Sequence, residues 1–377
     1  MRFVMIFLLL VVLGPSLVRA QTKPEKDYLL YVLSESADKI SLVRFGPEGI
    51  RVEREIETGD MPVDIDGPHG IVVSPDRQFY YVTIAHGRPF GTVWKYSTKN
   101  DKVVGKATLG YFPATLDISP DGNFLFVVNF NLHGDMVPST VSVVSTQTMT
   151  EVARIPTCTM PHGSRLNAQG TKQYSACMMN DMLVEIDTRT LKATRYFVVT
   201  KGQEKGMTGP PTATETHSMH GMAGHGSEAP KPGDNSCSPT WAEPSADGSS
   251  VFVACNGSSE IVEINAKAWT LVRRIPARAG VYNLEATHDG QRLIATNKRD
   301  QSVSIYELKS GKELVRLPTK RKVLHGVVVS PDDRYAFVTV EGIGSEPGTV
   351  EVIDLAALKT VATLDVGAAA AGIDFYK

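Results

Sequence analysis

Apolar and polar positions along the chain repeat in copies of roughly 40–50 residues. Each copy opens with a short apolar strand, passes through a polar turn of the Ser-Pro-Asp-Gly type, and returns in a second apolar strand such as Phe124–Asn129. Two further alternating strands complete a copy, as at residues 141–145 and 151–155. Repeated sets of four short strands predict an all-β, seven-bladed β-propeller. The first strands are expected to begin at Pro68, Pro113, Pro161, Pro239, Val281, Leu324 and Ala370.

The two ends of the chain each carry half of a copy. Residues 371–376 match a first strand with no second strand after them, and Tyr28–Ser34 matches a second strand with no first strand before it. Pairing these halves completes one blade and removes strand edges that would otherwise promote aggregation. We therefore expect the ring to close between the N-terminal and C-terminal strands.

The first 20 residues have the pattern of a cleavable export signal. Arg2 precedes an apolar run, residues 3–13, that is too short to span a bilayer, and Val18 and Ala20 place small residues at a cleavage site. Cleavage after Ala20 predicts a periplasmic or secreted chain, residues 21–377, that forms one propeller domain and does not insert into the membrane. An uncleaved membrane anchor is the alternative. The net charge of −2 gives no electrostatic footprint for nucleic acid.

Eight of the nine histidines are expected on one face of the ring. In a propeller the first strand of a blade starts at the face called the top, and the second strand returns to it. The second position of a copy therefore lies at the mouth of the central channel, and three copies carry histidine there: His69, His162 and His325. His86 and His133 follow second strands and share the top face. Because histidine is a common metal ligand, this clustering predicts a metal site, while a hydrogen bond to a neighbouring carbonyl is the alternative role of each ring.

An insertion at residues 200–237 separates blades four and five. Its Gly, Pro, Ser and Thr content predicts a loop, which we expect to leave and rejoin the top face. It resembles the His/Met-rich loops of periplasmic copper-handling proteins, since thioethers favour Cu(I) and imidazole accepts either oxidation state. Chance enrichment in a flexible loop is the alternative. The candidate ligands are His217, Met219, His220, Met222 and His225.

The four cysteines occupy equivalent places in blades four and five. Cys177 and Cys255 each stand seven residues after the glycine of a turn, and Cys158 and Cys237 each precede a first strand. Neighbouring strands of one sheet bring such positions within bridging distance. We predict the disulfides Cys158–Cys177 and Cys237–Cys255, which an oxidising compartment favours. The alternative is that Cys177 and Cys255 are thiolate ligands of copper.

The ends of the second strands resemble the YVTN β-propeller repeat family. Residues 81–83, 126–129, 294–297 and 337–339 read Tyr-Val-Thr, Phe-Val-Val-Asn, Ile-Ala-Thr-Asn and Phe-Val-Thr. The resemblance covers nearly the whole mature chain and implies the fold, whereas such propellers serve as enzymes, cofactor-binding subunits or adaptors. The top-face histidines are also similar in arrangement to the propeller of nitrous oxide reductase, which holds a copper cluster. This chain lacks that enzyme's cupredoxin domain and adjacent His-His pair.

These observations predict an exported propeller that binds a metal ion, copper, through top-face histidines and a mobile His/Met arm, and that delivers or senses it. One alternative is an adaptor that binds a periplasmic protein or an envelope polymer without metal. Another is an enzyme, either redox-active at copper or a lactonase-like hydrolase with a divalent cation held by carboxylates. The inner-strand carboxylates available for this purpose are Asp117, Glu243, Glu285 and Asp374.

Overall fold

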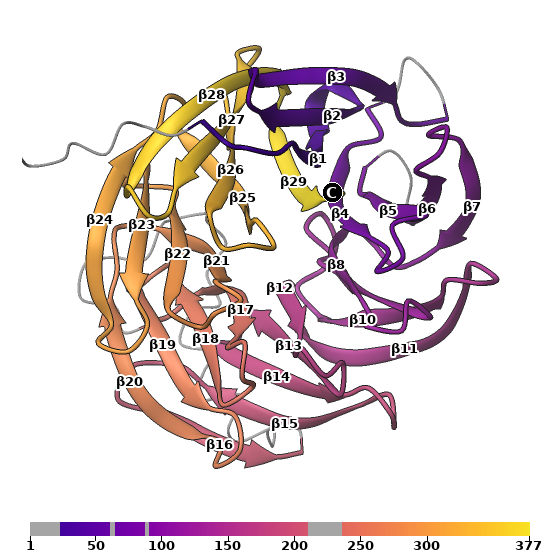
Figure 1. Ribbon diagram of the computed structural model, residues 1–377. Coiled ribbons are helices and arrows are strands. Elements are labelled where there is room, and N and C mark those ends of the chain that lie inside the picture. The colour runs from indigo at the N-terminus through magenta and orange to yellow at the C-terminus, as the bar shows by residue number, and fades with distance from the viewer. Residues whose placement is uncertain (1–22, 61–64, 87–89, 210–235) are drawn as a thin grey trace, which may run out of the picture.

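The protein is a closed ring of seven antiparallel sheets, of which six have four strands and one, blade four, has five. A computed structural model describes residues 23–60, 65–86, 90–209 and 236–377. Figure 1 looks along the ring axis, with one strand of each blade facing the centre and the last strand of each blade at the rim. Blade one joins the two ends of the chain, and blades two to seven follow in chain order. The predicted all-β, seven-bladed β-propeller is confirmed.

The two inner strands of every blade are almost completely buried. The strands that line the channel are β4 (Pro68–Val73), β8 (Pro113–Ile118), β12 (Pro161–Leu166), β17 (Pro239–Pro244), β21 (Val281–Ala286), β25 (Val323–Val329) and β29 (Ala370–Phe375). The second strands are β1 (Tyr28–Ser34), β5 (Phe79–Ile84), β9 (Phe124–Asn129), β13 (Lys172–Cys177), β18 (Ser250–Cys255), β22 (Arg292–Asn297) and β26 (Tyr335–Glu341). The predicted strand starts are reproduced, with β25 beginning one residue earlier.

The third strand of each blade is mostly buried, and most exposed side chains lie on the fourth strand at the rim. The third strands are β2 (Lys39–Gly46), β6 (Thr92–Ser97), β10 (Pro138–Ser145), β14 (Met182–Asp187), β19 (Glu260–Asn265), β23 (Ser302–Glu307) and β27 (Pro347–Asp354). The fourth strands are β3 (Gly49–Glu57), β7 (Val103–Thr108), β11 (Thr150–Thr159), β15 (Lys192–Val198), β20 (Thr270–Pro276), β24 (Lys312–Pro318) and β28 (Lys359–Ala368). A 3-10 turn, η1 (Glu35–Ala37), follows β1.

The polar turns between first and second strands need a left-handed residue at their fourth position. Gly122 and Gly248 have φ values of 74° and 71° there, which glycine adopts without a steric cost. At the second position after the serine, Asp121 accepts hydrogen bonds from the Ser119 hydroxyl and the Asn123 amide. Asp247 repeats this arrangement in blade five. In blades three and five the Ser-x-Asp-Gly pattern is therefore fixed by the geometry of the turn that joins the two inner strands.

The ring closes by pairing between β1 and β29. Tyr31 pairs with Asp374 and Val32 with Ile373 in an antiparallel ladder, so blade one combines strands from both ends of the chain. Tyr28 and Ile373 then enter one buried cluster with Phe337 of blade seven. The predicted closure is confirmed.

Threonine hydroxyls tie neighbouring blades together around the channel. Thr83, fully buried on β5, accepts a hydrogen bond from the Gly70 amide at 2.8 Å and donates to the Ala114 carbonyl of blade three at 2.9 Å. Thr339 makes the equivalent pair of contacts with the Gly326 amide and the Ala371 carbonyl of blade one. These bonds hold the second position of one inner strand against the preceding blade.

The insertion begins on the top face, as expected. The Thr200 hydroxyl, just after β15, donates to the Asp181 carboxylate, which follows β13, at 2.9 Å. Residues 205–208 then form β16 (Lys205–Thr208), a fifth strand on the rim of blade four that pairs with β15. The insertion therefore starts with a strand where a loop was expected. It rejoins at 236–238, where the Asp181 carboxylate accepts hydrogen bonds from the Cys237 and Ser238 amides at 2.8 Å each.

Both predicted disulfides are present. Cys158 is bonded to Cys177 and Cys237 to Cys255, and no free cysteine remains. Cys158 lies in β11, the last strand of blade three, so the first bond joins blades three and four, whereas it was expected within blade four. The alternative in which Cys177 and Cys255 ligate copper as thiolates is therefore wrong. Within the described ranges no helix is long and apolar enough to cross a membrane.

Thr83→Ala should destabilise the ring by about 1–3 kcal/mol, because it leaves a buried amide and a buried carbonyl without partners. Thr83→Ser keeps the hydroxyl and serves as the matched control. Urea unfolding followed by tryptophan fluorescence measures both variants. Equal stability of the Ala and Ser variants would show that the hydroxyl bonds between blades contribute nothing.

Candidate functional site

The second position of each inner strand faces the channel mouth, and the structure brings the three histidines at this position together. The His69 ring lies 5.0 Å from the His325 ring and 6.4 Å from the His162 ring, measured between centroids. All three side chains are buried. The complete set at this position is His69, Ala114, His162, Thr240, Tyr282, His325 and Ala371.

Glu35 holds two of the top-face histidines. Its Oε2 lies 3.0 Å from His69 Nδ1, and its Oε1 lies 2.6 Å from His86 Nε2. Burial opposes ionisation of Glu35, but the contacts with His69 and His86 outweigh it and lower the pKa of the carboxyl. The hydrogen bond to Glu35 in turn raises the pKa of His86. The second ring nitrogen of His69, Nε2, is buried and finds no hydrogen-bond partner in the described part of the chain.

His162 is fixed on both sides. Its Nδ1 lies 3.0 Å from the Thr240 carbonyl oxygen, which can only accept, so Nδ1 carries the proton. Its Nε2 is then an acceptor and lies 3.0 Å from the Tyr282 hydroxyl, which donates. Burial lowers the pKa of His162 to about 3, so the ring is neutral at physiological pH.

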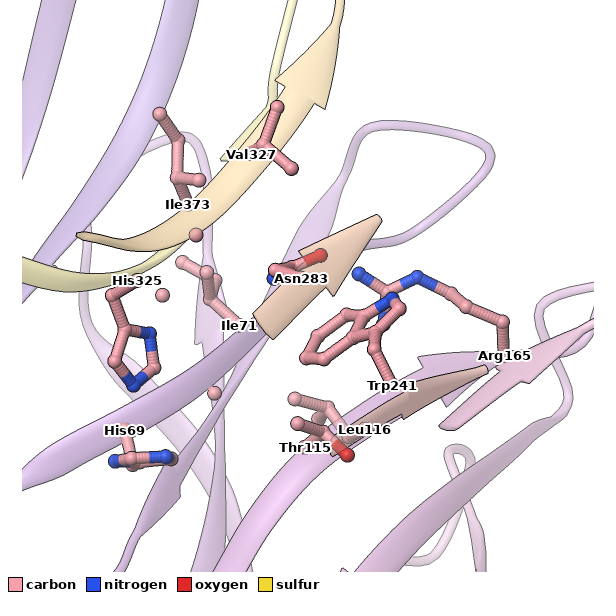
Figure 2. A pocket seen from close by; sticks show the side chains of 13 residues that line it. His69, Ile71, Thr115, Leu116, Arg165, Trp241, Asn283, His325, Val327 and Ile373 are labelled. Carbon is pink, nitrogen blue, oxygen red and sulfur yellow. The ribbon is translucent and has the colours of Figure 1, made fainter. Parts of the chain in front are cut away.

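His325 has no hydrogen bond within the described residues, although it is buried. In Figure 2 one nitrogen of its ring is directed toward His69. Burial lowers the pKa of His325 well below the usual range, and the neighbouring Lys298 lowers it further. The channel mouth therefore holds a neutral imidazole whose nitrogens are available to a ligand.

A second set of mouth residues was missed by the sequence analysis. Glu35 follows β1, Lys298 follows β22, and Glu341 ends β26, so all three stand at the top ends of second strands. Burial lowers the pKa of Lys298 and raises that of Glu341. Lys298 Nζ lies 3.6 Å from the centre of the Tyr282 ring. The sequence signal for these three residues is that each occupies the same position of its copy, at the end of the second strand.

The opposite half of the mouth is apolar. Phe112, Phe130 and Met160 form a buried cluster, against which Met178 packs. This agrees with a packing role for the methionines of blade four. His133 lies at the outer border of this cluster, 6.0 Å from the His86 ring, and makes no hydrogen bond within the described ranges. The charged and the apolar halves therefore face each other across the histidines.

Below the histidines lies a cavity of about 40 Å³. His69 and His325 line one end of it, and Arg165 and Trp241 lie on another wall (Figure 2). The Arg165 guanidinium stacks over the Trp241 ring at 4.5 Å. The Asn283 side chain also lines the cavity, and its Oδ1 is buried without a hydrogen-bond partner in the described residues. The cavity is thus small, polar at several points and connected to the histidine pair.

Inner-strand carboxylates surround Arg165, and three of them bond the next blade. Asp117 accepts a hydrogen bond from the Leu166 amide, Asp374 from the Val73 amide, and Glu243 from the Ala286 amide. Burial raises the pKa of Asp374 to about 6 and that of Glu243 to about 7, and it raises the pKa values of Asp117 and Glu285 as well. Because Asp117, Asp374 and Glu243 are engaged by backbone amides of the next blade, their role is to join blades, and this disfavours the prediction that they act as acids and bases in hydrolysis.

The described residues contain no group of three or more His, Cys, Asp or Glu side chains arranged to hold a metal ion. The three channel histidines are close to one another, but both ring nitrogens of His162 are already hydrogen-bonded, to the Thr240 carbonyl and the Tyr282 hydroxyl. The candidate ligands of the arm, residues 217–225, lie outside the described residues. Metal binding by the ring and by the arm therefore stays a prediction.

Comparison with known proteins supports the fold alone. No family model matches the sequence, and no curated protein matches it. The periplasmic gluconolactonase PpgL of Pseudomonas aeruginosa is 16% identical over 93% of this chain and 99% of that chain, with a TM-score of 0.68. A putative 6-phosphogluconolactonase of Bacteroides fragilis is 13% identical over 93% and 98%, with a TM-score of 0.67. The hydrazine synthase of Kuenenia stuttgartiensis is 20% identical over 84% and 92%, with a TM-score of 0.62.

Glu35→Gln should lower the pKa of His86 in the metal-free protein, because the charge-assisted hydrogen bond is lost. The raised His86 pKa contributes stability below about pH 6.5, and the lowered Glu35 pKa contributes it above about pH 4.3. The loss of stability is therefore expected to be largest between these values. NMR titration of the histidine ring protons measures the shift, and an unchanged His86 pKa would contradict the assigned contact.

Proposed function

We propose that this protein is an exported copper-binding propeller, which holds one copper ion in its reduced state at the channel mouth through His69 and His325. The observation that carries the proposal is the state of His69. Its Nδ1 faces the Glu35 carboxylate while its Nε2 is buried without a partner among the described residues. Metal-binding histidines usually donate one ring N–H to a carboxylate or carbonyl, which fixes the tautomer and leaves the other nitrogen free to bind.

The spacing of the two rings suits a shared ion. Metal–nitrogen bonds of about 2.0 Å place the centroids of two imidazoles on one ion roughly 5–6 Å apart. The His69 and His325 centroids are 5.0 Å apart. At this separation the two imidazoles would bind with a bent N–metal–N angle, so Cu(I) there would take a further ligand such as water, whereas Zn²⁺ is usually held by four ligands. The two disulfides agree with an oxidising compartment and so with export.

The size of the cavity favours an ion over an organic substrate. At about 40 Å³ it has space for one or two water molecules beside the histidines. Pockets for small organic ligands measure about 300–1,000 Å³. A lactonase-like reaction would have to take place above the mouth, where the described residues supply no carboxylate set for a divalent cation. Binding and delivery of copper is the simpler role for this geometry.

A second role, binding of a protein partner on the same face, is favoured by apolar side chains beside the mouth. Phe90 and Tyr111 are each about half exposed, at 49% and 48%, and their rings lie 5.1 Å apart. Met136 and Val137 are also exposed on the loop between β9 and β10. A periplasmic protein that delivers or receives copper would dock on this side of the mouth.

Replacing both His69 and His325 by Ala should abolish Cu(I) binding at the mouth, since it removes both proposed ligands. His288→Ala is the matched control, because His288 is exposed in a turn on the opposite face. Anaerobic titration against a chromophoric Cu(I) chelator measures affinity, and metal analysis gives the stoichiometry. Both variants are made in a chain without residues 210–235, so that arm and ring are separated. Copper retained in the double variant would overturn the proposal.

The His/Met-rich segment is proposed as a capture arm that raises the local copper concentration near the ring. Deletion of residues 210–235 should leave the Cu(I) affinity of the mouth unchanged and slow its loading from dilute copper. Stopped-flow measurement of copper transfer from the chelator tests this expectation. A variant in which the five His and Met residues of the arm are replaced by Ser controls for loop length. Loss of mouth affinity in both variants would place the copper site in the arm instead.

A further inference from the structure

Six of the seven blades join their third and fourth strands through a turn of four residues, and the last residue of each turn is left-handed. In blade five, for example, Asn265 pairs with Thr270, and residues 266–269 form the turn. Because third strands run from the top of the ring to the bottom, these turns lie on the face opposite to the histidines. The left-handed residues have φ values between 50° and 69° and are Asp101, Met149, Leu191, Trp269, Gly311 and Leu358.

At two junctions this residue meets an arginine of the preceding blade. The Trp269 ring of blade five lies 4.2 Å from the Arg195 guanidinium of blade four, and its Nε1 donates to the Tyr196 carbonyl at 2.8 Å. Asp101 of blade two forms an ion pair with Arg54 of blade one at 2.5 Å. The left-handed residue and the fourth strand of the preceding blade therefore close the space between the two blades together.

The other four turns close their junctions by apolar packing or through a long side chain of the preceding blade. Met149 packs so closely on Gly105 of blade two that no side chain would fit at Gly105. Gly311 has no side chain, and Arg273 of blade five reaches this turn and donates to the Leu308 carbonyl. The remaining two, Leu191 and Leu358, pack against buried clusters that include blades three and six.

The junction between blades seven and one lacks both partners. In blade one Gly46 pairs with Gly49, so the turn has two residues, and Gly49 faces open space. In blade seven Ala362 stands where blade four has Arg195, since both pair with the third strand at the same distance from the turn. A cavity of about 300 Å³ opens here, between β3 and β28, which meet where the ring closes (Figure 1).

The cavity is mainly apolar and contains a buried polar atom that lacks a partner. Tyr335 is 1% exposed, and its hydroxyl has no hydrogen-bond partner in the described part of the chain. The partly buried Asp354 and the exposed Lys23 also line the cavity, and their charges are opposite. The site therefore suits a neutral molecule with an apolar body and one polar group. The apolar lining consists of Pro24, Phe45, Val361 and Ala362.

We propose that this cavity binds a small neutral aromatic molecule with one hydrogen-bonding group, of the size of an indole or a phenol. The Trp269 indole fills the equivalent space between blades four and five, so the repeat supplies an example of a shape that fits. The volume of about 300 Å³ lies at the lower end of the range for small organic ligands. Apolar cavities accept aromatic rings because water inside them finds too few polar partners.

The Tyr335 hydroxyl gives the site its selectivity among aromatic molecules. A ligand with a hydroxyl or an N–H group satisfies this buried atom, whereas a ligand without one leaves it unpaired. One hydrogen bond of this kind corresponds to about tenfold in affinity. The inference is independent of copper, because the cavity and the histidines lie on opposite faces of the ring.

Isothermal titration calorimetry with indole and with 4-methylphenol tests the proposal. We expect dissociation constants of about 1 mM or below for ligands of this size. Ala362→Phe should fill the cavity and weaken the binding of both molecules about tenfold or more. Thr363→Phe is the matched control and should bind them as the wild type does, because Thr363 is exposed on β28 and does not line the cavity.

Toluene separates the hydroxyl contact from the fit of the ring, because it is 4-methylphenol without the hydroxyl. The wild-type protein should prefer 4-methylphenol to toluene, and Tyr335→Phe should lose this preference while still binding toluene. Circular dichroism checks that each variant is folded. Absence of binding to the wild type in the millimolar range, or unchanged binding in Ala362→Phe, overturns the inference. A preference that persists in Tyr335→Phe overturns the role of the hydroxyl.

Discussion

The site exists because β1 pairs with β29. This one antiparallel ladder turns an open stack of blades into a ring, and only a ring places the second positions of all inner strands around a common mouth. The same pairing brings the N-terminal strand beside blade two, so that Glu35 at the end of β1 reaches both His69 and His86. Closure therefore supplies the carboxylate that fixes the His69 tautomer, in addition to protecting strand edges.

The mouth that results is unequal on its two sides. Blades six, seven and one contribute Lys298, Glu341 and Glu35, and burial shifts the pKa of the first two toward the neutral form. The facing side is built from Phe112, Phe130 and sulfur-containing side chains that exclude water. A cation held between the two sides would have charged groups near it on one flank only.

The sequence was sufficient for features that follow from repetition. The propeller, its closure, both disulfides and the meeting of three histidines were predicted because equivalent positions in a repeat must be equivalent in space. Glu35 and Lys298 lay within reach of the same reasoning, since they also occupy one repeat position. The strand β16 was not, because Lys205-Gly206-Met207-Thr208 has no apolar alternation and forms only because β15 offers an open edge. Nor could the hydrogen bond from the Tyr282 hydroxyl to His162 be predicted, because it depends on the direction of two side chains.

The two disulfides stand on either side of the long insertion. One joins Cys158 of β11 in blade three to Cys177 of β13 in blade four, and the other joins Cys237, just before β17, to Cys255 of β18 in blade five. Both bonds are made without the segment at residues 210–235. A cut within residues 210–235 would leave two fragments that stay joined by the packing of β12 against β17 and by the hydrogen bonds from the Cys237 and Ser238 amides to Asp181. The stability of the ring should therefore depend little on the length and integrity of this connection. The segment at residues 210–235, between blades four and five, can therefore be replaced by another sequence without changes elsewhere in the propeller.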